Sequence, residues 1–294
     1  MRVSVIIPVY NVEPYLCETL QSLKSQTMQD FEVLLVDDHG TDRSIEVARA
    51  FTAGDARFRY LQTPHNGGPG VARNVGIEAA QGDYIAFIDG DDLYAPTFLE
   101  KLLSAATHNS ASEQGTATSL AQNRGIDLSY CQLQYRGGKR DGEVHRNPVV
   151  TRGEFTPSAK NHFLCRFVTF SVCFLFRREF LIDNDLRFPS RRNSEDTNFL
   201  TRCLLLAQTI ACVDEPLYYY CVRQESLTTG RNSRRYKERL AAVNALMRDF
   251  GQMKHDPRHQ SLQLSRYNLS MVLIWLKKGL AQSLLEIIKN FIHR

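Results

Sequence analysis

The sequence lacks the features that would place it in several protein classes. Its seven cysteines are scattered and odd in number, and no two of them form a CxxC pair. A zinc site or a disulfide framework is therefore not expected, and free thiols in a reducing cytoplasm fit best. No run approaches the roughly 18 to 20 apolar residues that a membrane-spanning helix needs. The apolar N-terminus breaks at Pro8 and has no small-residue cleavage site, which favours a first strand over a signal peptide.

Charge is distributed unevenly along the chain. The net charge is +4, but residues 227–294 hold 13 Lys and Arg against 4 Asp and Glu, whereas residues 1–226 hold 23 against 28. Either an anionic partner or a solvated helical face explains a basic tail on a mildly acidic body. The chain shows no recognisable nucleic-acid-binding module, so we expect no nucleic-acid partner.

Strands and helices alternate over the first 90 residues. Buried apolar runs predict strands at 3–10, 31–37, 58–62 and 83–89, and helical patterns occupy 14–26, 43–53 and 71–80. This rhythm predicts a parallel sheet covered by helices. Ligands of such sheets bind at the carboxyl ends of the strands, so the polar clusters that follow these strands are the place to look for function.

The pattern is looser beyond residue 96. Residues 107–125 are rich in Ser, Thr, Ala, Gln and Asn and predict a surface loop. Thr151 and Glu154 match the capping-box spacing, which predicts a helix after them. Further helices are expected at 96–106, 177–184, 195–207, 233–254 and 260–292, and strands at 126–135, 169–176 and 216–222.

Two acidic clusters directly follow predicted strands. Asp37 and Asp38 end the second strand, where a carboxylate accepts a hydrogen bond from a base N–H or binds a metal, although turn chemistry explains such a pair as well. Asp89, Asp91 and Asp92 follow the fourth strand. Three carboxylates so close repel each other unless a cation is present, and Mg²⁺ or Mn²⁺ would suit them. The alternative is that Asp91 or Asp92 caps the next helix.

Two further clusters lie at predicted helix starts. In HNGGPGVARNVG, glycines precede a helix start, where backbone amides can approach an anion, and a structural turn is the alternative. Arg73 lies in the first turn, where a cation is unfavourable for the helix dipole, so its presence favours an anionic partner. In NSEDTNF, Glu195 and Asp196 fall in a first turn, where acids are favourable, so helix stability alone would explain them.

Together these segments resemble the family 2 glycosyltransferases. VSVIIPVYN, FEVLLVDDHGTD, NGGPGVARNVGIEAAQGDYIAFIDGDDLY and SEDTNFL occur in the order and spacing of that family, densely over 3–100 and more loosely over 165–228. The resemblance implies a GT-A fold of the α/β class, with a Rossmann-like, mostly parallel sheet flanked by helices. The implied divisions are a transferase domain at 1–228, its nucleotide-sugar half at 1–106, its acceptor half at 126–228, and a basic helical region at 229–294.

The resemblance also implies roles for single residues around the nucleotide. Pro8, Tyr10 and Asp38 match positions that hold the base, with Tyr10 stacking on it and Asp38 accepting its N–H. Asp89 matches the acid that faces the ribose. Arg73 matches a residue near the base and the phosphates.

The remaining implied roles concern the reaction itself. Asp91 matches the metal-binding acid, with Asp92 beside it, and Asp196 matches the catalytic base, with Glu195 as its neighbour on the donor or acceptor sugar. The segment YYYCVRQESLTT resembles a later stretch in which Arg223 and Ser226 reach the diphosphate. Two departures from the family pattern are His39, where Gly or Ser is usual, and the polar insertion at 107–125.

The activity implied by the resemblance is an inverting, Mn²⁺- or Mg²⁺-dependent transfer of a sugar from a nucleotide-sugar donor to an acceptor hydroxyl. A UDP-sugar is preferred, because Asp38 suits a uracil N3–H. The family's usual work points to a saccharide or lipid-linked saccharide acceptor in bacterial surface polysaccharide or lipopolysaccharide synthesis. A non-catalytic nucleotide-binding scaffold is one alternative, against which the intact acids argue. A nucleotidyltransferase is another, but it would normally carry a Gly-rich basic loop where PVYNVEPY stands.

The C-terminal segment 260–294 carries Leu, Ile and Phe at helical spacing with Lys and Arg among them. Such an amphipathic helix can lie in a membrane interface, and packing on the body or on a second subunit is equally open. We therefore expect a cytoplasmic protein, and leave open peripheral contact of 260–294 with the inner face of the cytoplasmic membrane and a homo-oligomer.

Overall fold

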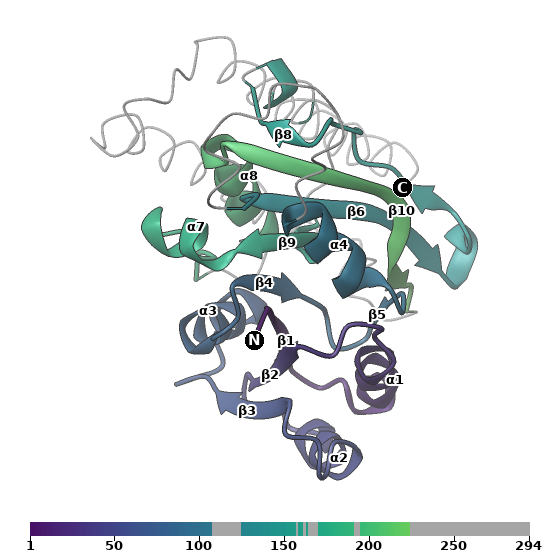
Figure 1. Cartoon of the computed structure of the whole chain (residues 1–294). Helices are drawn as coiled ribbons and strands as arrows, with labels where there is room; N and C mark the ends of the chain where they lie inside the picture. The colour runs from purple at the N-terminus through teal and green to yellow at the C-terminus, as the bar shows by residue number, and fades with distance from the viewer. Residues whose placement is uncertain (108–124, 157, 161–162, 164–169, 191–194, 224–294) are drawn as a thin grey trace, which may run out of the picture.

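The computed structural model describes residues 1–107, 125–156, 158–160, 163, 170–190 and 195–223 (Figure 1). Its strands are β1 Val3–Val9, β2 Phe31–Asp37, β3 Phe58–Gln62, β4 Tyr84–Phe87, β5 Leu93–Tyr94, β6 Leu128–Arg136, β7 Val144–His145, β8 Gly153–Glu154, β9 Phe174–Arg177 and β10 Thr209–Cys221. Its helices are α1 Glu13–Lys24, α2 Ser44–Phe51, α3 Pro69–Ala79, α4 Phe98–Thr107, α7 Arg178–Asp183 and α8 Glu195–Leu206, with short 3₁₀ turns η1 Gly138–Arg140 and η2 Ser171–Cys173.

One continuous sheet organises these elements in the order β3-β2-β1-β4-β9-β6-β10-β5. The first four strands are parallel, β9 is antiparallel to both of its neighbours, and β6 and β10 run parallel to each other. The α/β architecture with a largely parallel central sheet agrees with the sequence-based expectation. The strand order reverses direction at β1, so β1 and β4 flank a topological switch point, where ligands of such sheets bind.

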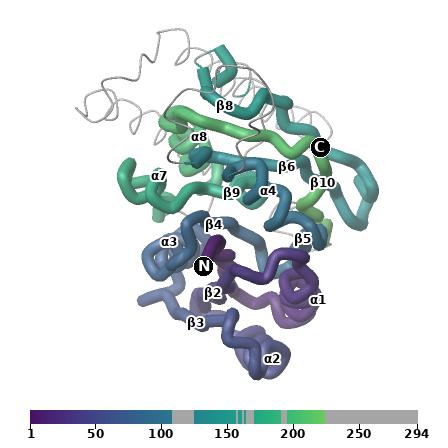
Figure 2. The backbone as a smooth tube through the Cα atoms, viewed as in Figure 1, coloured from purple at the N-terminus to yellow at the C-terminus, as the bar shows by residue number. Residues whose placement is uncertain are grey.

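Helices cover both faces of the parallel strands, as the backbone views show (Figure 2). The crossovers from β1 to β2 and from β2 to β3 both move toward the β3 edge of the sheet. The crossover from β3 through α3 moves the opposite way, past β2 and β1, to β4. Because such connections are right-handed, α3 lies on the face opposite to α1 and α2. The N-terminal end of α3 consequently points to the carboxyl edge of the sheet.

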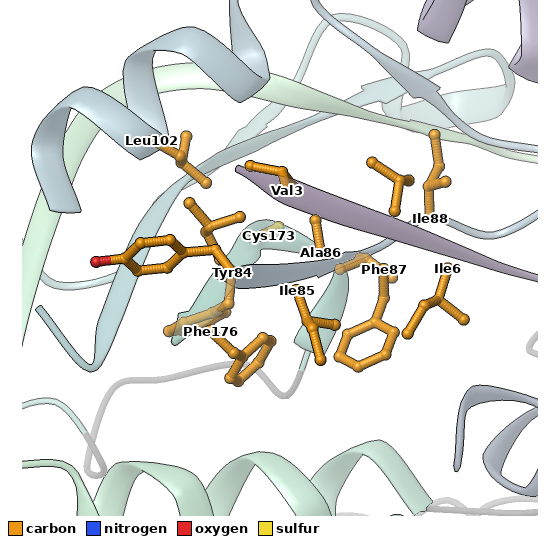
Figure 3. Close-up of a cluster of buried hydrophobic side chains, with 14 of the residues drawn as sticks. Val3, Ile6, Tyr84, Ile85, Ala86, Phe87, Ile88, Leu102, Cys173 and Phe176 are labelled. Carbon is orange, nitrogen blue, oxygen red and sulfur yellow. The ribbon is translucent and has the colours of Figure 1, made fainter. Parts of the chain in front are cut away.

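The centre of the sheet is apolar on both faces, as parallel strands covered on both sides require. Ile6 of β1 and Ile85 and Phe87 of β4 are fully buried. Figure 3 shows Ile85, Phe87 and Phe176 pointing to one side of the strands, with Leu102 of α4 on the other side. This packing fixes the strand ends that carry the polar clusters.

Most predicted elements are confirmed with shifts of a few residues at their ends, but the capping-box interpretation of Thr151 and Glu154 is wrong. Glu154 belongs to β8, which pairs antiparallel with β10. The helical turn begins after Thr156, whose Oγ1 accepts the backbone N–H of Ala159 at 3.3 Å. Spacing alone misassigned the cap, because the pairing partner lies some 55 residues further along the chain.

Several expectations fall on residues outside the described ranges. These are the predicted helices at 233–254 and 260–292, the division at 229–294, Ser226 and nearly all of the loop at 107–125. Across the part of the chain that the structure describes, no helix is both long and apolar enough to cross a membrane.

Gly82, between α3 and β4, offers a test of the packing at the central strands. A Cβ there would lie 2.6 Å from the backbone N of Ser4 and 2.7 Å from the backbone carbon of Val3. Because β1 cannot move aside, Gly82→Ala should lower the free energy of unfolding by about 3 kcal/mol in denaturant titrations. Gly54→Ala is the control, since Gly54 has φ +80° but open space around it and should cost only about 1 kcal/mol. Equal losses in the two variants would contradict the packing argument.

Candidate active site

The carboxyl ends of β1 and β2 bring the expected base-binding residues to one edge of the sheet. Asp38 donates its backbone N–H to the Val9 carbonyl at 2.9 Å, which holds the two strand ends together. Tyr10 follows β1 directly and is 46% exposed, so its ring is free to stack on a planar ligand. Pro8 lies half-buried within β1, two residues before Tyr10. These three residues therefore share one corner of the site.

The Asp38 carboxylate is buried against the glycine loop. It accepts backbone N–H groups from Gly67 at 2.9 Å and Gly68 at 2.7 Å, and the Thr63 hydroxyl at 3.0 Å. Gly68 has φ +87°, a conformation that favours glycine. The anion that the glycine loop holds here is thus the protein's own Asp38. A carboxylate offers about four acceptor positions, so Asp38 retains capacity for one more donor.

Arg73 is the centre of the site, and it lies at the start of the second turn of α3, because the helix begins at Pro69, two residues before its predicted start. Its side chain is 2% exposed, and its guanidinium contacts Asp89 at 2.6 Å, Asp196 at 3.1 Å and Glu195 at 3.5 Å. Burial alone would lower the pKa of Arg73, but the three carboxylates outweigh it and raise that pKa above its ordinary value. The anionic partner expected for Arg73 is therefore a set of three acids from two other elements.

The two acids of α8, Glu195 and Asp196, have raised pKa values in this arrangement. Burial, followed by the charge of Asp196, raises the pKa of Glu195 to about 7, and Arg73 offsets part of the effect. Burial also raises the pKa of Asp196, against the opposing charge of Arg73 and a hydrogen bond from Ser171. One guanidinium cannot neutralise three carboxylates, so the cluster favours additional protons or cations. A carboxylate with a raised pKa suits a general base.

The start of α8 is held against α3 by specific contacts. The Asn74 side chain exchanges two hydrogen bonds with the backbone of Phe188, at 2.8 and 2.9 Å. The Phe188 ring stacks on Phe199 of α8 at 3.8 Å between centroids. Gly70 permits the approach, because a Cβ there would lie 3.1 Å from the carbonyl oxygen of Pro189. Glycine in this first turn therefore serves helix packing.

Asp91 and Asp92 are adjacent in sequence but differ in their surroundings. Asp92 is buried, and its two oxygens accept the Tyr218 hydroxyl at 2.6 Å and the backbone N–H of Cys221 at 2.7 Å. Asp91 is half-buried, and burial and the charge of Asp89 raise its pKa to about 6, although Arg223 opposes the shift. Asp92 thus fastens the end of β10, whereas the Asp91 carboxylate carries unneutralised charge.

These surroundings bear on the expected metal. Within the described ranges, no group of three or more His, Cys, Asp and Glu side chains is arranged to hold a metal ion. Mg²⁺ at nucleotide sites commonly uses only one or two carboxylates and takes its other ligands from phosphates and water. The charge crowding of Asp91 with Asp89 fits such an ion. The oxygens of Asp92 are already engaged, so Asp91 is the better candidate ligand, and the assignment of both stays a prediction.

Arg223 reaches the same corner from the end of β10. It donates to the backbone carbonyl of Asp91 at 2.7 Å, and its guanidinium lies over the Tyr15 ring at 3.9 Å. A cation is therefore held beside Asp91, and its contact with a diphosphate stays a prediction. Ser226, its predicted companion, lies outside the described residues.

Three residues of the site were not found from the sequence. Ser171 donates its hydroxyl to Oδ1 of Asp196 at 2.8 Å, but it lies in an apolar run that carries no polar signal. Tyr218 was assigned only to a strand, although it bonds Asp92. Asn11, two residues after the end of β1, accepts the backbone N–H of Thr41 at 2.7 Å and joins the two loops, and its position offered a signal.

Known proteins resemble the chain over much of its length. The sequence pattern described as Glycosyl transferase family 2 matches residues 4–183. The glycosyltransferase EpsJ of Bacillus subtilis is 35% identical over 77% of the chain, which spans 62% of EpsJ. The poly(ribitol-phosphate) β-N-acetylglucosaminyltransferase TarS of Staphylococcus aureus is 30% identical over 76% of the chain and 36% of its own length. The chain thus spans less than two thirds of either relative.

Solved structures share the fold. The structure of TarS residues 1–349 in complex with UDP aligns with a TM-score of 0.60 and 26% identity over 83% of the chain and 64% of that structure. A mannosyltransferase from Pyrobaculum calidifontis in complex with GDP-mannose and Mn²⁺ aligns with a TM-score of 0.55 and 16% identity over 97% and 87%. The second likeness concerns the fold alone.

The raised pKa of Glu195 predicts a pH-dependent stability. The folded protein keeps this proton to about pH 7, whereas the unfolded chain releases it near pH 4.5. Stability should therefore fall as the pH rises between these values, by at most about 3 kcal/mol, and stay level above them. Glu195→Gln cannot ionise, so denaturant titrations should show its stability rising relative to wild type from pH 5 to pH 8.

A glutamate with the opposite shift provides the control for this prediction. The exposed Glu46 has its pKa lowered by Arg43, so its contribution to stability is present above its unfolded pKa and lost in acid. Glu46→Gln should therefore change the pH dependence slightly in the opposite sense. A Glu195→Gln variant whose stability runs parallel to wild type from pH 5 to pH 8 would show that Glu195 has no raised pKa.

Proposed function

The chain belongs to glycosyl transferase family 2, and from this premise we propose that it is an inverting glycosyltransferase that moves a sugar from a nucleotide-sugar donor to an acceptor hydroxyl. The observation that carries the proposal is the Arg73 cluster, in which one guanidinium joins Asp89 at the end of β4 to Asp196 at the start of α8. In the proposed roles, Asp89 as the ribose-facing acid and Asp196 as the general base would lie within reach of one substrate.

The donor end of this substrate is best accounted for by a UDP-sugar. Tyr10 would stack on the base, and Asp38, with its remaining acceptor capacity, would take the N3–H of uracil. Asp89 would accept ribose hydroxyls. The complex of TarS with UDP supports this choice, because TarS is a relative of similar fold.

The reacting end requires a leaving group and a base. Mg²⁺ or Mn²⁺ bound at Asp91 would offset the negative charge on the departing diphosphate. Arg223, fixed on Tyr15, would add a cation beside it. Asp196 would remove the proton from the acceptor hydroxyl as this attacks the anomeric carbon from the face opposite the diphosphate. Attack from that face inverts the configuration, with an acceptor hydroxyl in the place that water takes in inverting glycosidases.

The acceptor is proposed from the relatives. The name of TarS describes transfer of N-acetylglucosamine to poly(ribitol-phosphate). We therefore propose that this chain transfers a hexosyl or N-acetylhexosaminyl group to a saccharide or lipid-linked saccharide in the synthesis of a bacterial surface polysaccharide or lipopolysaccharide. Membrane contact through 260–294 and a homo-oligomer remain predictions about residues outside the described ranges.

Donor hydrolysis tests the proposed function without a known acceptor. A panel of UDP-, GDP- and dTDP-sugars is incubated with Mn²⁺, and diphosphate release is measured. We expect slow, metal-dependent release from one donor, a loss of about 10²- to 10⁴-fold in Asp196→Asn because the base is removed, and no metal-dependent release in Asp91→Ala. Asp83→Asn, at an exposed carboxylate, is the control and should hydrolyse the donor like wild type.

Calorimetric titration with nucleoside diphosphates separates the alternatives. Binding with Mn²⁺ but no hydrolysis of any donor would favour the non-catalytic scaffold. The absence of both nucleotide binding and donor hydrolysis would refute the transferase. Hydrolysis that survives in Asp196→Asn would remove that residue from the role of base and leave the class intact.

A further inference from the structure

The carboxylate of Asp196 is held asymmetrically. Its Oδ1 accepts two hydrogen bonds, one from the Ser171 hydroxyl at 2.8 Å and one from Arg73 at 3.1 Å. Both donors are buried, Ser171 completely and Arg73 to within 2% of its surface, whereas the Asp196 side chain is 24% exposed. Within the ranges that the structure describes, no hydrogen-bond donor reaches Oδ2. The rigid side of the carboxylate is therefore Oδ1.

The two donors differ in what else they hold. The Arg73 guanidinium also binds Asp89 and Glu195, so its geometry depends on three acids at once. In the proposed mechanism Asp89 also binds the ribose, so donor binding would change the partners of Arg73. Among the described residues, the Ser171 hydroxyl bonds only Asp196. It lies in η2, directly before β9, which pairs with β4 in the sheet.

We propose that Ser171 is a positioning residue for the base: its hydroxyl fixes Oδ1 of Asp196 so that Oδ2 faces the acceptor hydroxyl and receives its proton. The inference rests on the proposed function. A neutral donor suits this task, because it orients the carboxylate without the full charge of a second cation, which would weaken the base more strongly. No bond to the substrate is assigned to Ser171.

The chain contains a matched control in Ser129 of β6. It is also completely buried, and its hydroxyl donates to the Leu102 backbone carbonyl at 2.9 Å, away from the acids. Ser129→Ala and Ser171→Ala each remove one buried hydroxyl and one hydrogen bond. The two substitutions should lower the melting temperature by similar amounts. A difference in activity between them would therefore reflect the place of Ser171 beside Asp196 and not a loss of stability.

The test is the pH profile of donor hydrolysis with Mn²⁺, using the donor that wild type hydrolyses best. Ser171→Ala should lower kcat about tenfold, the equivalent of one hydrogen bond to a charged group, and leave the donor KM within about twofold. The acid limb of kcat should move to higher pH by about half to one unit, because the ionised base loses a hydrogen bond. Ser129→Ala should leave kcat and the limb unchanged.

Two results would overturn the inference while the proposed function stands. One is a Ser171→Ala variant with the kcat and acid limb of wild type, and the other is an equal fall in kcat in both serine variants. A ¹³C NMR titration of the aspartate carboxyls, with Asp196 assigned through Asp196→Asn, decides the case without turnover. The Asp196 resonance should titrate at higher pH in Ser171→Ala than in Ser129→Ala, and identical titrations would refute the role even in a protein that hydrolyses no donor.

Discussion

The buried guanidinium of Arg73 is the constraint on which the rest of the site depends. It is shared by an acid from the end of β4 and two acids from the start of α8, so three segments must meet within hydrogen-bond distance. Breaking a buried ion pair by removing one partner typically costs about 3–5 kcal/mol, because the other charge stays buried. Burial and then the charge of Asp196 raise the pKa of Glu195 to about 7, because Arg73 offsets only part of these effects, and the site stays open to further positive charge.

The fold delivers this meeting through strand order. α3 crosses to the face opposite α1 and α2, so its N-terminus and Arg73 lie beside the switch point between β1 and β4. The antiparallel β9 next to β4 brings η2, and with it Ser171, to the same edge. The Asn74 and Phe188 contacts then place α8 so that Asp196 meets Arg73. Packing between α3, α8 and the segment before it therefore sets the geometry of the Arg73 cluster.

The sequence reveals those parts of the site that are local. The elements of the first 90 residues, the acids after β2 and β4 and the family itself follow from periodicity and motifs within short windows. Contacts between distant segments do not follow from these signals. Arg73 binds Asp196 across 123 residues, Asp38 accepts the glycine N–H groups that favoured a phosphate, and Ser171 lies in a mostly apolar run. Glu154 likewise pairs with a strand some 55 residues further along the chain.

Asp91 and Asp92 show why geometry must assign the members of an acidic motif. The two acids are adjacent in sequence, yet both oxygens of Asp92 accept hydrogen bonds, from Tyr218 and Cys221, and these bonds fix the chain just before Arg223. Arg223 in turn binds the backbone of Asp91. Asp92 thus helps to place Arg223, and Arg223 lies beside Asp91, whose carboxylate has a pKa of about 6. Neither carboxylate can substitute for the other, because one orders the site and the other would meet the substrate.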